Sequence, residues 1–341
     1  MKNILFEHPA LNKLISVKDF PGTAKLLLEE QKKSWTILTE NYSALNFVEV
    51  KSFQFSGFKI KVQHNPGRIK STSAEVDETS ISERKCFLCP DNLYEEQKAI
   101  KYGEDFLILV NPFPIFPEHF TIPHRDHIPQ SIRENFGKIL SVSRDFSEYV
   151  VIYNGPECGA SAPDHLHFQI GSKNFLPVSD EFHSLKNEPA PQGGYGEILL
   201  RNNSLTITGI DDNLRKIIAL EGTEIKAAEK VFDLFYKTYL KISDKNKEPL
   251  LNILSFYEEE YGWRVLIFLR EKHRPSHYFR EDGRILLSPA AVDLGGICIL
   301  PLEKNFKKIT KKDIEEIFKE VSIGKEQFGF IKSELKKTLN D

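Results

Sequence analysis

The sequence predicts a mixed α/β fold of the α+β kind, with two related units of antiparallel sheet and helix around a half-barrel-type core. Short apolar strands alternate with amphipathic helices along the chain. The order strands, helix, strands occurs in both halves, which indicates a diverged duplication. No low-complexity tract or short-period repeat is found, which argues against solenoid and fibrous folds.

The elements of the N-terminal half follow from hydrophobic periodicity and turn residues. In chain order they are a helix at 22–44, an extended segment through FKIKVQ, strands in FLILVNPFPIF and HFTIPHRDH around a Pro-rich turn, a helix from about Ser131 to Phe146, and strands at YVVIYN and HLHFQI. We assign the elements from residue 61 onward to a first unit at residues 61–200, on which the preceding helical and extended segment, residues 1–60, packs.

The C-terminal half, residues 201–341, is predicted to form the second unit and to end in a helix. A loop-rich region after Gly171 leads into it. Its elements are a helix at about 222–242, a hairpin in PLLNILSFYEEEYGWRVLIFLREKH, the segment ILLSPAAVDLGGICILP, and a charged helical ending from about Lys311 to Leu339.

Composition excludes several classes of function. With 40% hydrophobic residues, 28% charged residues and a net charge of -3, the 341-residue chain lacks the basic excess of a nucleic-acid binder. No window approaches about 18 uninterrupted apolar residues, and the N-terminus has no secretory signal pattern. We therefore expect a cytoplasmic protein without nucleic-acid or membrane partners, either a monomer or a homodimer. Cys158 and Cys298 stand apart and are expected to be buried thiols.

The pair Cys86 and Cys89, in CFLC, has the spacing of two ligands of one Zn²⁺ ion. Two thiolates supply only half of a closed site, so the other ligands would be imidazoles, with His127 and His165 as candidates. The alternatives are two ordinary core thiols and a redox dithiol; the dithiol is disfavoured because no clear helix starts at the second cysteine.

The stretch GASAPDHLHFQI, residues 159–170, places polar side chains at alternate positions. As a strand it sends His165, His167 and Gln169 to one face, and the apolar residues between them to the other. Residues two apart are roughly 6.6 Å apart, so His165 can bind a metal while His167 faces substrate. The alternative is an edge strand whose histidines face water.

The same stretch suits phosphorus chemistry. A neutral imidazole such as that of His167 attacks activated phosphorus and forms a covalent intermediate, provided that a backbone carbonyl or similar acceptor fixes its other ring nitrogen. Gln169 can donate to a phosphate oxygen without adding charge. Gly159, Ala160 and Ser161 let backbone amides and a hydroxyl approach that phosphate.

Two other motifs are less specific. PEHFTIPHRDH contains His119, His124 and His127, of which we expect one or two at most to be functional. In NPFPIF, the amide of Asn111 could hold a sugar or phosphate oxygen, but Asn before Pro is also a common turn former.

Together these motifs resemble the histidine-triad superfamily. The likeness is to its branch of galactose-1-phosphate uridylyltransferase, diadenosine tetraphosphate phosphorylases and GDP-hexose phosphorylases. CFLCPDN resembles the zinc-binding CFLCxxN of the uridylyltransferases, and GASAPDHLHFQ is similar to the GASxxxHLHFQ of plant GDP-L-galactose phosphorylases. The likeness covers about residues 60–171. Asp164 is a departure, because the uridylyltransferase loop is one residue shorter.

The resemblance implies a role for each matching residue. The implied structural zinc ligands are Cys86, Cys89, His127 and His165. His167 would be the nucleophile, with Gln169 and Ser161 as phosphate contacts. Further substrate contacts would be Arg68, Asn111 and Asn154. The family's second metal site has no clear counterpart among His183, His273 and His277.

The resemblance implies a HIT-like nucleotidyltransferase or phosphorylase. It would move a nucleoside monophosphate group from a nucleotide sugar or dinucleotide to phosphate or a sugar phosphate. The alternatives are a hydrolase of the same superfamily, a zinc-stabilised nucleotide-binding protein without turnover, and a thioredoxin-like redox protein. In the degenerate second unit, a basic turn could bind phosphate or simply be solvated: Arg270, Lys272, His273 and Arg274.

Overall fold

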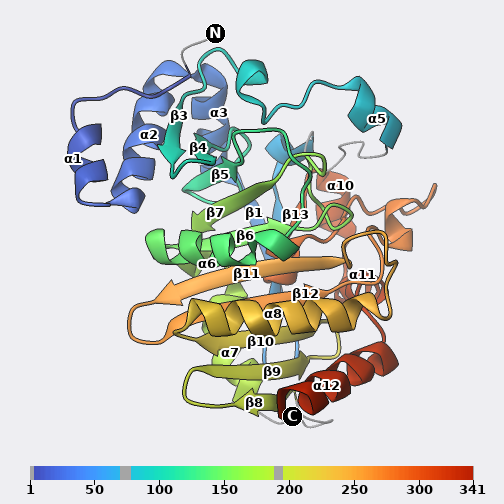
Figure 1. The fold of residues 1–341 in the computed structure, drawn as a ribbon. Helices are drawn as coiled ribbons and strands as arrows, with labels where there is room; N and C mark the ends of the chain where they lie inside the picture. Colours follow the sequence, from blue (N-terminus) through green and yellow to red (C-terminus); the bar gives the residue numbers. More distant parts are fainter. Residues whose placement is uncertain (1–3, 70–77, 188–194, 341) are drawn as a thin grey trace.

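A ten-stranded antiparallel sheet runs through the molecule and joins its two halves (Figure 1). The structure is a computed structural model and describes residues 4–69, 78–187 and 195–340. In spatial order the strands are β3 (Ala99–Tyr102), β4 (Phe106–Val110), β5 (His119–Pro123), β7 (His167–Ser172), β6 (Tyr149–Asn154), β11 (Leu251–Glu258), β12 (Gly262–Leu269), β10 (Lys216–Gly222), β9 (Leu205–Asp211) and β8 (Gly196–Arg201).

The two halves of this sheet repeat one topology. Each has three consecutive strands, a helix, and a hairpin whose second strand returns beside the third strand. The connecting helices are α6 (Phe136–Asp145) and α8 (Ile225–Leu240). The halves meet where β6 pairs with β11, with Asn154 opposite Asn252. The prediction of two related units of antiparallel sheet and helix is therefore confirmed.

Helices cover one face of the sheet. They are α2 (Phe20–Ser34), α3 (Thr36–Ala44), α6, α8 and α12 (Lys325–Asn340), and α1 (Leu11–Ser16) contacts α2. The rings of Phe136 in α6 and Phe232 in α8 stack with centroids 3.9 Å apart, so one aromatic contact ties together the helices of the two halves. None of the helices in the described ranges is long and apolar enough to cross a membrane.

A second layer lies against the other face. It contains a three-stranded sheet of β1 (Glu49–Gln54), β2 (Lys59–His64) and β13 (Ile297–Leu300), together with α7 (Pro177–Asn187), α9 (Ala291–Leu294), α10 (Glu303–Lys308) and α11 (Lys311–Val321). A further helix, α5 (Glu78–Glu83), precedes the cysteine pair. Phe168 and Ile170 of β7 are buried in the core under the helices, so His167 and Gln169 point toward this second layer.

Two of the expected long helices are each divided in two. Trp35 has extended backbone angles, φ -124° and ψ 99°, and separates α2 from α3. Its ring is buried and packs at 5.2 Å from that of Tyr94, so burial of this side chain accompanies the break. The charged ending is also two helices, α11 and α12.

Two further expectations are corrected. The region after Gly171 was expected to be loop, but its first part contains α7, which buries Val178, Phe182 and Leu185 against the sheet; residues 188–194 lie outside the described ranges. The segment HLHFQI is a strand only from His167 onward.

We predict that replacing Phe232 with Ala lowers the free energy of unfolding by about 3 to 5 kcal/mol, because it removes a stacked ring from a filled core. Equilibrium urea denaturation measures this change. Phe47 is 84% exposed, so Phe47→Ala is the matched control and should change stability by less than about 0.5 kcal/mol. Equal effects of the two substitutions would show that the ring stack does not stabilise the joined halves.

Candidate active site

A cavity of about 290 Å³ opens beside the first residues of β7. His167 and Gln169 line it from β7, and Asn111 lines it from the turn after β4. A smaller cavity of about 90 Å³ adjoins it, because Arg68, Ser161 and Gln169 line both. Several of the residues predicted from the sequence to contact substrate thus meet at one place, although they come from distant segments.

Hydrogen bonds hold both the backbone and the ring of His167. Its backbone N–H donates to Oε1 of Gln130 at 2.8 Å, and its ring Nδ1 lies 2.8 Å from the carbonyl oxygen of His165, to which it donates. That carbonyl is the acceptor that a nucleophilic imidazole requires, and Nε2 is left to react with a group in the cavity. Burial lowers the pKa of His167 to about 4, so the ring is neutral at neutral pH.

Gln130 is a site residue that sequence reasoning missed. Besides accepting from the backbone of His167, its side chain donates to the carbonyl oxygens of Asn154 at 2.9 Å and of His167 at 3.2 Å. It therefore connects the last residue of β6 to the first residue of β7. A lone Gln in a loop carries no spacing pattern, so no sequence signal marked it.

Gln169 lies two residues beyond His167 on the same face of β7, and its side-chain oxygen is already engaged. Oε1 of Gln169 is 2.9 Å from Nε2 of His119, which is fully buried at the start of β5. Among the three histidines of PEHFTIPHRDH, His119 contacts a predicted phosphate ligand and His127 lies in a cysteine and histidine cluster, whereas His124 bonds only locally through its ring.

The loop between β6 and β7 approaches the smaller cavity closely. Gly159 has φ of +92°, and a Cβ there would lie 2.7 Å from Cβ of Ala290, so both conformation and space require glycine. Gly159, Ala160 and Ser161 line the smaller cavity together. The prediction of a small-residue loop near the reacting group is consistent with this placement.

Arg68 and Asn111 lie at the proline turn after β4. Arg68 donates through Nη1 to the carbonyl oxygen of Phe113 at 2.6 Å; burial lowers its pKa to about 10, which leaves it charged at neutral pH. Oδ1 of Asn111 accepts from the backbone N–H of Phe113 at 3.0 Å, and its Nδ2 donates to Thr121 at 3.2 Å. Asn111 thus forms the turn and also lines the cavity.

Asn154 ties the site to the C-terminal half. Its Oδ1 accepts from Nδ2 of Asn252 at 2.8 Å and from the backbone N–H of Ala291 at 2.9 Å. These two donors orient the amide, so the Nδ2 group is the part of the side chain that can donate to a ligand in the smaller cavity, which Asn154 lines.

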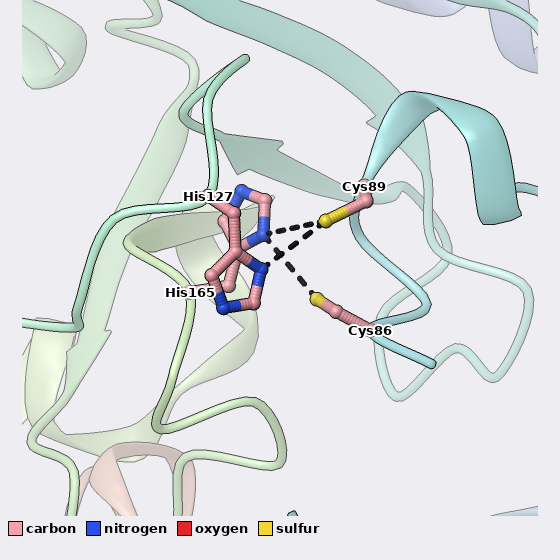
Figure 2. A group of neighbouring side chains, drawn as sticks. All are labelled: Cys86, Cys89, His127 and His165. Atoms are coloured by element: carbon pink, nitrogen blue, oxygen red, sulfur yellow. Dashed lines mark hydrogen bonds between the residues drawn. The ribbon is translucent and has the colours of Figure 1, made fainter. Parts of the chain in front are cut away.

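Four side chains converge on a possible metal centre (Figure 2). Cys86, Cys89, His127 and His165 offer ligand atoms that all lie within 4.8 Å of one another. Sγ of Cys86 is 3.3 Å from Nδ1 of His165, and Sγ of Cys89 is 3.2 Å from Nδ1 of His127 and 3.7 Å from that of His165. A tetrahedral zinc ion places sulfur and nitrogen ligands about 3.5 Å apart, so the residues fit this ion.

The hydrogen bonds of His165 suit a metal ligand. Its Nε2 lies 2.7 Å from the carbonyl oxygen of His124, to which it donates, so the Nδ1 lone pair points at the thiols. Burial, and next the neighbouring Cys86, raise the pKa of the Cys89 thiol to about 12. The Cys89 thiol is therefore protonated at neutral pH, and a divalent cation would favour its thiolate.

Asp164, the extra residue of the loop, connects the cluster to the larger cavity. Its Oδ2 is 3.5 Å from Nε2 of His127, and its Oδ1 is 3.1 Å from Nη2 of Arg84. The same Nη2 donates to the carbonyl oxygen of Ser161 at 3.0 Å, and Arg84 lines the larger cavity. A carboxylate on the outer nitrogen of a metal-binding histidine orients that ligand. Arg84 was missed, because a single arginine in a polar segment gives no sequence signal.

The histidines considered for a second metal site do not converge. His183 is near Arg264 at 3.5 Å, His277 is near Glu316 at 3.2 Å, and His273 lines the smaller cavity. Within the ranges that the structure describes, the cluster of Figure 2 is the one group of three or more His, Cys, Asp or Glu side chains close enough to share an ion.

The four residues of the basic turn in the second unit differ in what they contact: two are engaged with the protein, and two line a cavity. The guanidinium of Arg270 is buried and donates to carbonyl and amide oxygens of the protein, and Lys272 pairs with Glu320 at 3.0 Å. His273 and Arg274 instead line the smaller cavity. Only these two of the four are placed to meet a ligand there.

Two family models match separate parts of the chain. Residues 27–172 match one described as a domain of unknown function (DUF4922), and residues 200–341 match one described as the GDPGP1-like C-terminal domain. Comparison with curated protein sequences gives no significant match.

Solved structures of yeast Ap4A phosphorylase Apa2 share the fold. One superposes with a TM-score of 0.55 at 14% identity, covering 84% of this chain and 96% of that chain. The complex with AMP gives 0.54 at 15% identity, over 87% and 96%, and the complex with Ap4A gives 0.51 at 14% identity, over 84% and 96%. The chain therefore shares the fold of these Ap4A phosphorylase structures, and its residues 200–341 match the GDPGP1-like C-terminal domain; both findings confirm the phosphorylase resemblance that the sequence motifs indicated.

Proposed function

We propose that this chain is a nucleotidyltransferase or phosphorylase that transfers a nucleoside monophosphate group through His167. One observation carries the proposal. The ring of His167 is neutral, is fixed through Nδ1 by the carbonyl of His165, and lines a cavity that also contains Arg68, Ser161 and Gln169. A fixed nucleophile beside a cation and neutral donors is the arrangement that attack on a phosphate diester or anhydride requires.

The reaction would proceed in two displacements. First, Nε2 of His167 attacks the α-phosphorus of the donor. A P–N bond forms, the bond from phosphorus to the bridging oxygen breaks, and the leaving group departs with the electron pair. Then an oxygen of inorganic phosphate or of a sugar phosphate attacks the same phosphorus, and the P–N bond breaks. Throughout, the Nδ1–H of His167 stays on the carbonyl of His165, which supports the positive charge on the substituted ring.

Charge on the nonbridging oxygens would be met by donors along the border between the two cavities. Arg68 supplies a partly buried cation, while Gln169 and Ser161 supply neutral donors, and all three line both cavities. In a site that excludes water, one such donor contributes about 3 kcal/mol to lowering the barrier.

The two cavities suggest where the parts of the substrate bind. Apolar and aromatic side chains, among them Phe87, Tyr94, Leu109 and Phe113, line the larger cavity and suit a nucleoside. The smaller cavity is more polar and suits the leaving or accepting group. The complexes of yeast Ap4A phosphorylase with AMP and with Ap4A support a nucleotide or dinucleotide as substrate.

We propose that the three segments predicted from the sequence, residues 1–60, 61–200 and 201–341, have different roles. Residues 61–200 supply the nucleophile and the metal cluster, on which residues 1–60 pack. Residues 201–341 supply one wall of the smaller cavity through His273 and Arg274. The second unit thus takes part in substrate binding even though it has no counterpart of His167.

The cluster of Cys86, Cys89, His127 and His165 would hold a structural Zn²⁺ ion. Four protein ligands complete a tetrahedron and leave no position for a metal-bound water, so the ion would supply cross-linking and not a nucleophile. Its ligands join the segment of Cys86 to the residue whose carbonyl fixes the ring of His167. In this proposal the metal stabilises the site and takes no part in the displacement.

A panel assay tests the proposed function. UDP-, GDP- and ADP-sugars and dinucleoside polyphosphates are each incubated with the protein, with and without phosphate or hexose 1-phosphates. Products that carry the acceptor support transfer. Release of nucleoside monophosphate at the same rate without any acceptor would instead identify a hydrolase, and tight nucleotide binding without product would identify a binding protein.

Replacing His167 with Gly should lower transfer by about 10⁴-fold or more, since removal of a catalytic nucleophile has effects of this order. We expect the fold and the metal content to stay near those of the unmodified chain. With a labelled donor, the unmodified chain should keep label after denaturation at alkaline pH, where phosphohistidine survives, and the variant should not. His183→Ala, which removes an exposed histidine outside the site, is the control. Undiminished transfer by the Gly variant rules out the covalent route.

Replacing Cys86 with Ser should remove the metal first and activity as a consequence. Metal analysis should fall from about one zinc ion per chain to near zero, and the free energy of unfolding should fall by about 3 to 5 kcal/mol, because loss of a metal site is among the largest single-residue effects. Cys158 is also buried but lies outside the cluster, so Cys158→Ala should keep the zinc and most of the activity. Purified chain without zinc but with a titratable dithiol would favour the redox alternative.

A further inference from the structure

His119 is a buried histidine that lines neither cavity, yet it contacts a residue that lines both. It begins β5 and is fully buried, with its ring edge against Phe116 at 5.2 Å. Two donors hold its backbone carbonyl: the hydroxyl of Tyr42 and the N–H of Asn111, each at 2.9 Å. Contacts within the protein therefore hold both the backbone and the ring of this residue.

The neighbours of His119 determine where its proton lies. Nδ1 is 3.2 Å from the backbone nitrogen of Ile115, which can only donate, so Nδ1 is an acceptor. A neutral imidazole with an accepting Nδ1 carries its proton on Nε2. That Nε2 is 2.9 Å from Oε1 of Gln169, to which it donates. The backbone of Ile115 thus selects the tautomer that can hold the amide of Gln169.

This contact selects one orientation of the Gln169 side chain. With Oε1 engaged by His119, the NH₂ group is the part of the amide left to donate toward the cavities. In the flipped orientation, NH₂ would face the N–H of His119, and the carbonyl oxygen would face the anionic substrate. Both contacts of the flipped form are repulsive.

We propose that His119 is a positioning residue, which acts through Gln169 by fixing its amide with the NH₂ group toward the phosphate undergoing transfer. The proposal rests on the proposed nucleotidyl transfer and extends it to a residue that touches neither the reacting atoms nor the metal cluster. It gives neutral Gln169 a fixed donor direction before substrate binds, so no reorientation is needed during the reaction.

The surroundings of His119 keep its ring in the neutral form that holds Gln169. Burial, and next the charge of Arg68, lower the pKa of His119 to about 3, so the ring stays neutral at physiological pH. A protonated ring would turn Nδ1 into a donor facing the N–H of Ile115. The arginine that lines both cavities therefore also favours the ring state that holds Gln169.

The test is a double-mutant cycle with His119→Phe and Gln169→Ala in the full chain. His119→Phe keeps a ring of similar size and removes both nitrogens. It should lower kcat for transfer about 10-fold, as a misaligned group does, with a smaller change in KM. In the Gln169→Ala background the same change should cost less than 2-fold. His119→Gln, which keeps a side-chain donor, should recover part of the loss. Equal losses in both backgrounds would overturn the proposal, because His119 would then act independently of Gln169.

Further measurements separate this proposal from the function on which it rests. Gln169→Glu keeps an acceptor for His119 but presents a carboxylate to the phosphate, so it should lower activity at least as much as Gln169→Ala. The cycle is repeated on the affinities for AMP and GMP by titration calorimetry. A chain that binds these nucleotides without transferring them would refute the proposed function, and the coupling in affinity would still decide the role of His119.

Separate measurements test whether each variant is folded. Zinc content and melting temperature are compared for every variant, and if His119→Phe does not fold, His119→Gln and Gln169→Glu supply the comparison. The nitrogen-15 spectrum of the unmodified chain should show His119 protonated on Nε2. Protonation on Nδ1 would overturn the proposal, whatever the activities.

Discussion

One residue, His165, connects the cluster of cysteines and histidines that could hold a metal ion to the proposed nucleophile. Its ring faces two thiols, and its backbone carbonyl accepts the hydrogen bond that fixes the ring of His167. A shift of the His165 backbone would therefore disturb both the ring that faces the thiols and the carbonyl that orients His167. Because the pair sits where the chain enters β7, the sheet holds one end of this arrangement and the cysteine segment holds the other.

The fold makes a site that neither half of the chain contains alone. The two halves repeat one topology and meet at β6 and β11, where Asn154 lies opposite Asn252. Asn252 and the backbone of Ala291 orient Asn154, and the second half also supplies His273 and Arg274 to the smaller cavity. In the proposed reaction, the duplicated sheet thus provides two surfaces that differ in role, one for the reacting histidine and one for the group that leaves or accepts.

Neutral groups in fixed orientation are common around the cavities. Gln130 clamps the backbone of His167, and His119 holds the oxygen of Gln169. An amide presents either a donor or an acceptor, so its usefulness to an anionic substrate depends on which end faces the ligand. Here buried neighbouring groups fix which end of the amide faces the ligand. These groups are neutral, and the charged side chains that line the larger cavity are Arg68 and Arg84.

The sequence by itself determined what depends on short separations. The spacing of Cys86 and Cys89 indicated a metal pair, the alternation around His167 indicated one reactive face, and periodicity indicated two related units of sheet and helix. Only the tertiary structure decided which remote residues complete the site. His119 contacts Gln169, which lies 50 positions later in the chain, and no sequence pattern links the two residues. Long-range contacts arise from strand pairing and packing, which fix neighbours in space without leaving a local pattern in the chain; for the same reason, the break at Trp35 appeared only once its ring was seen buried in the core.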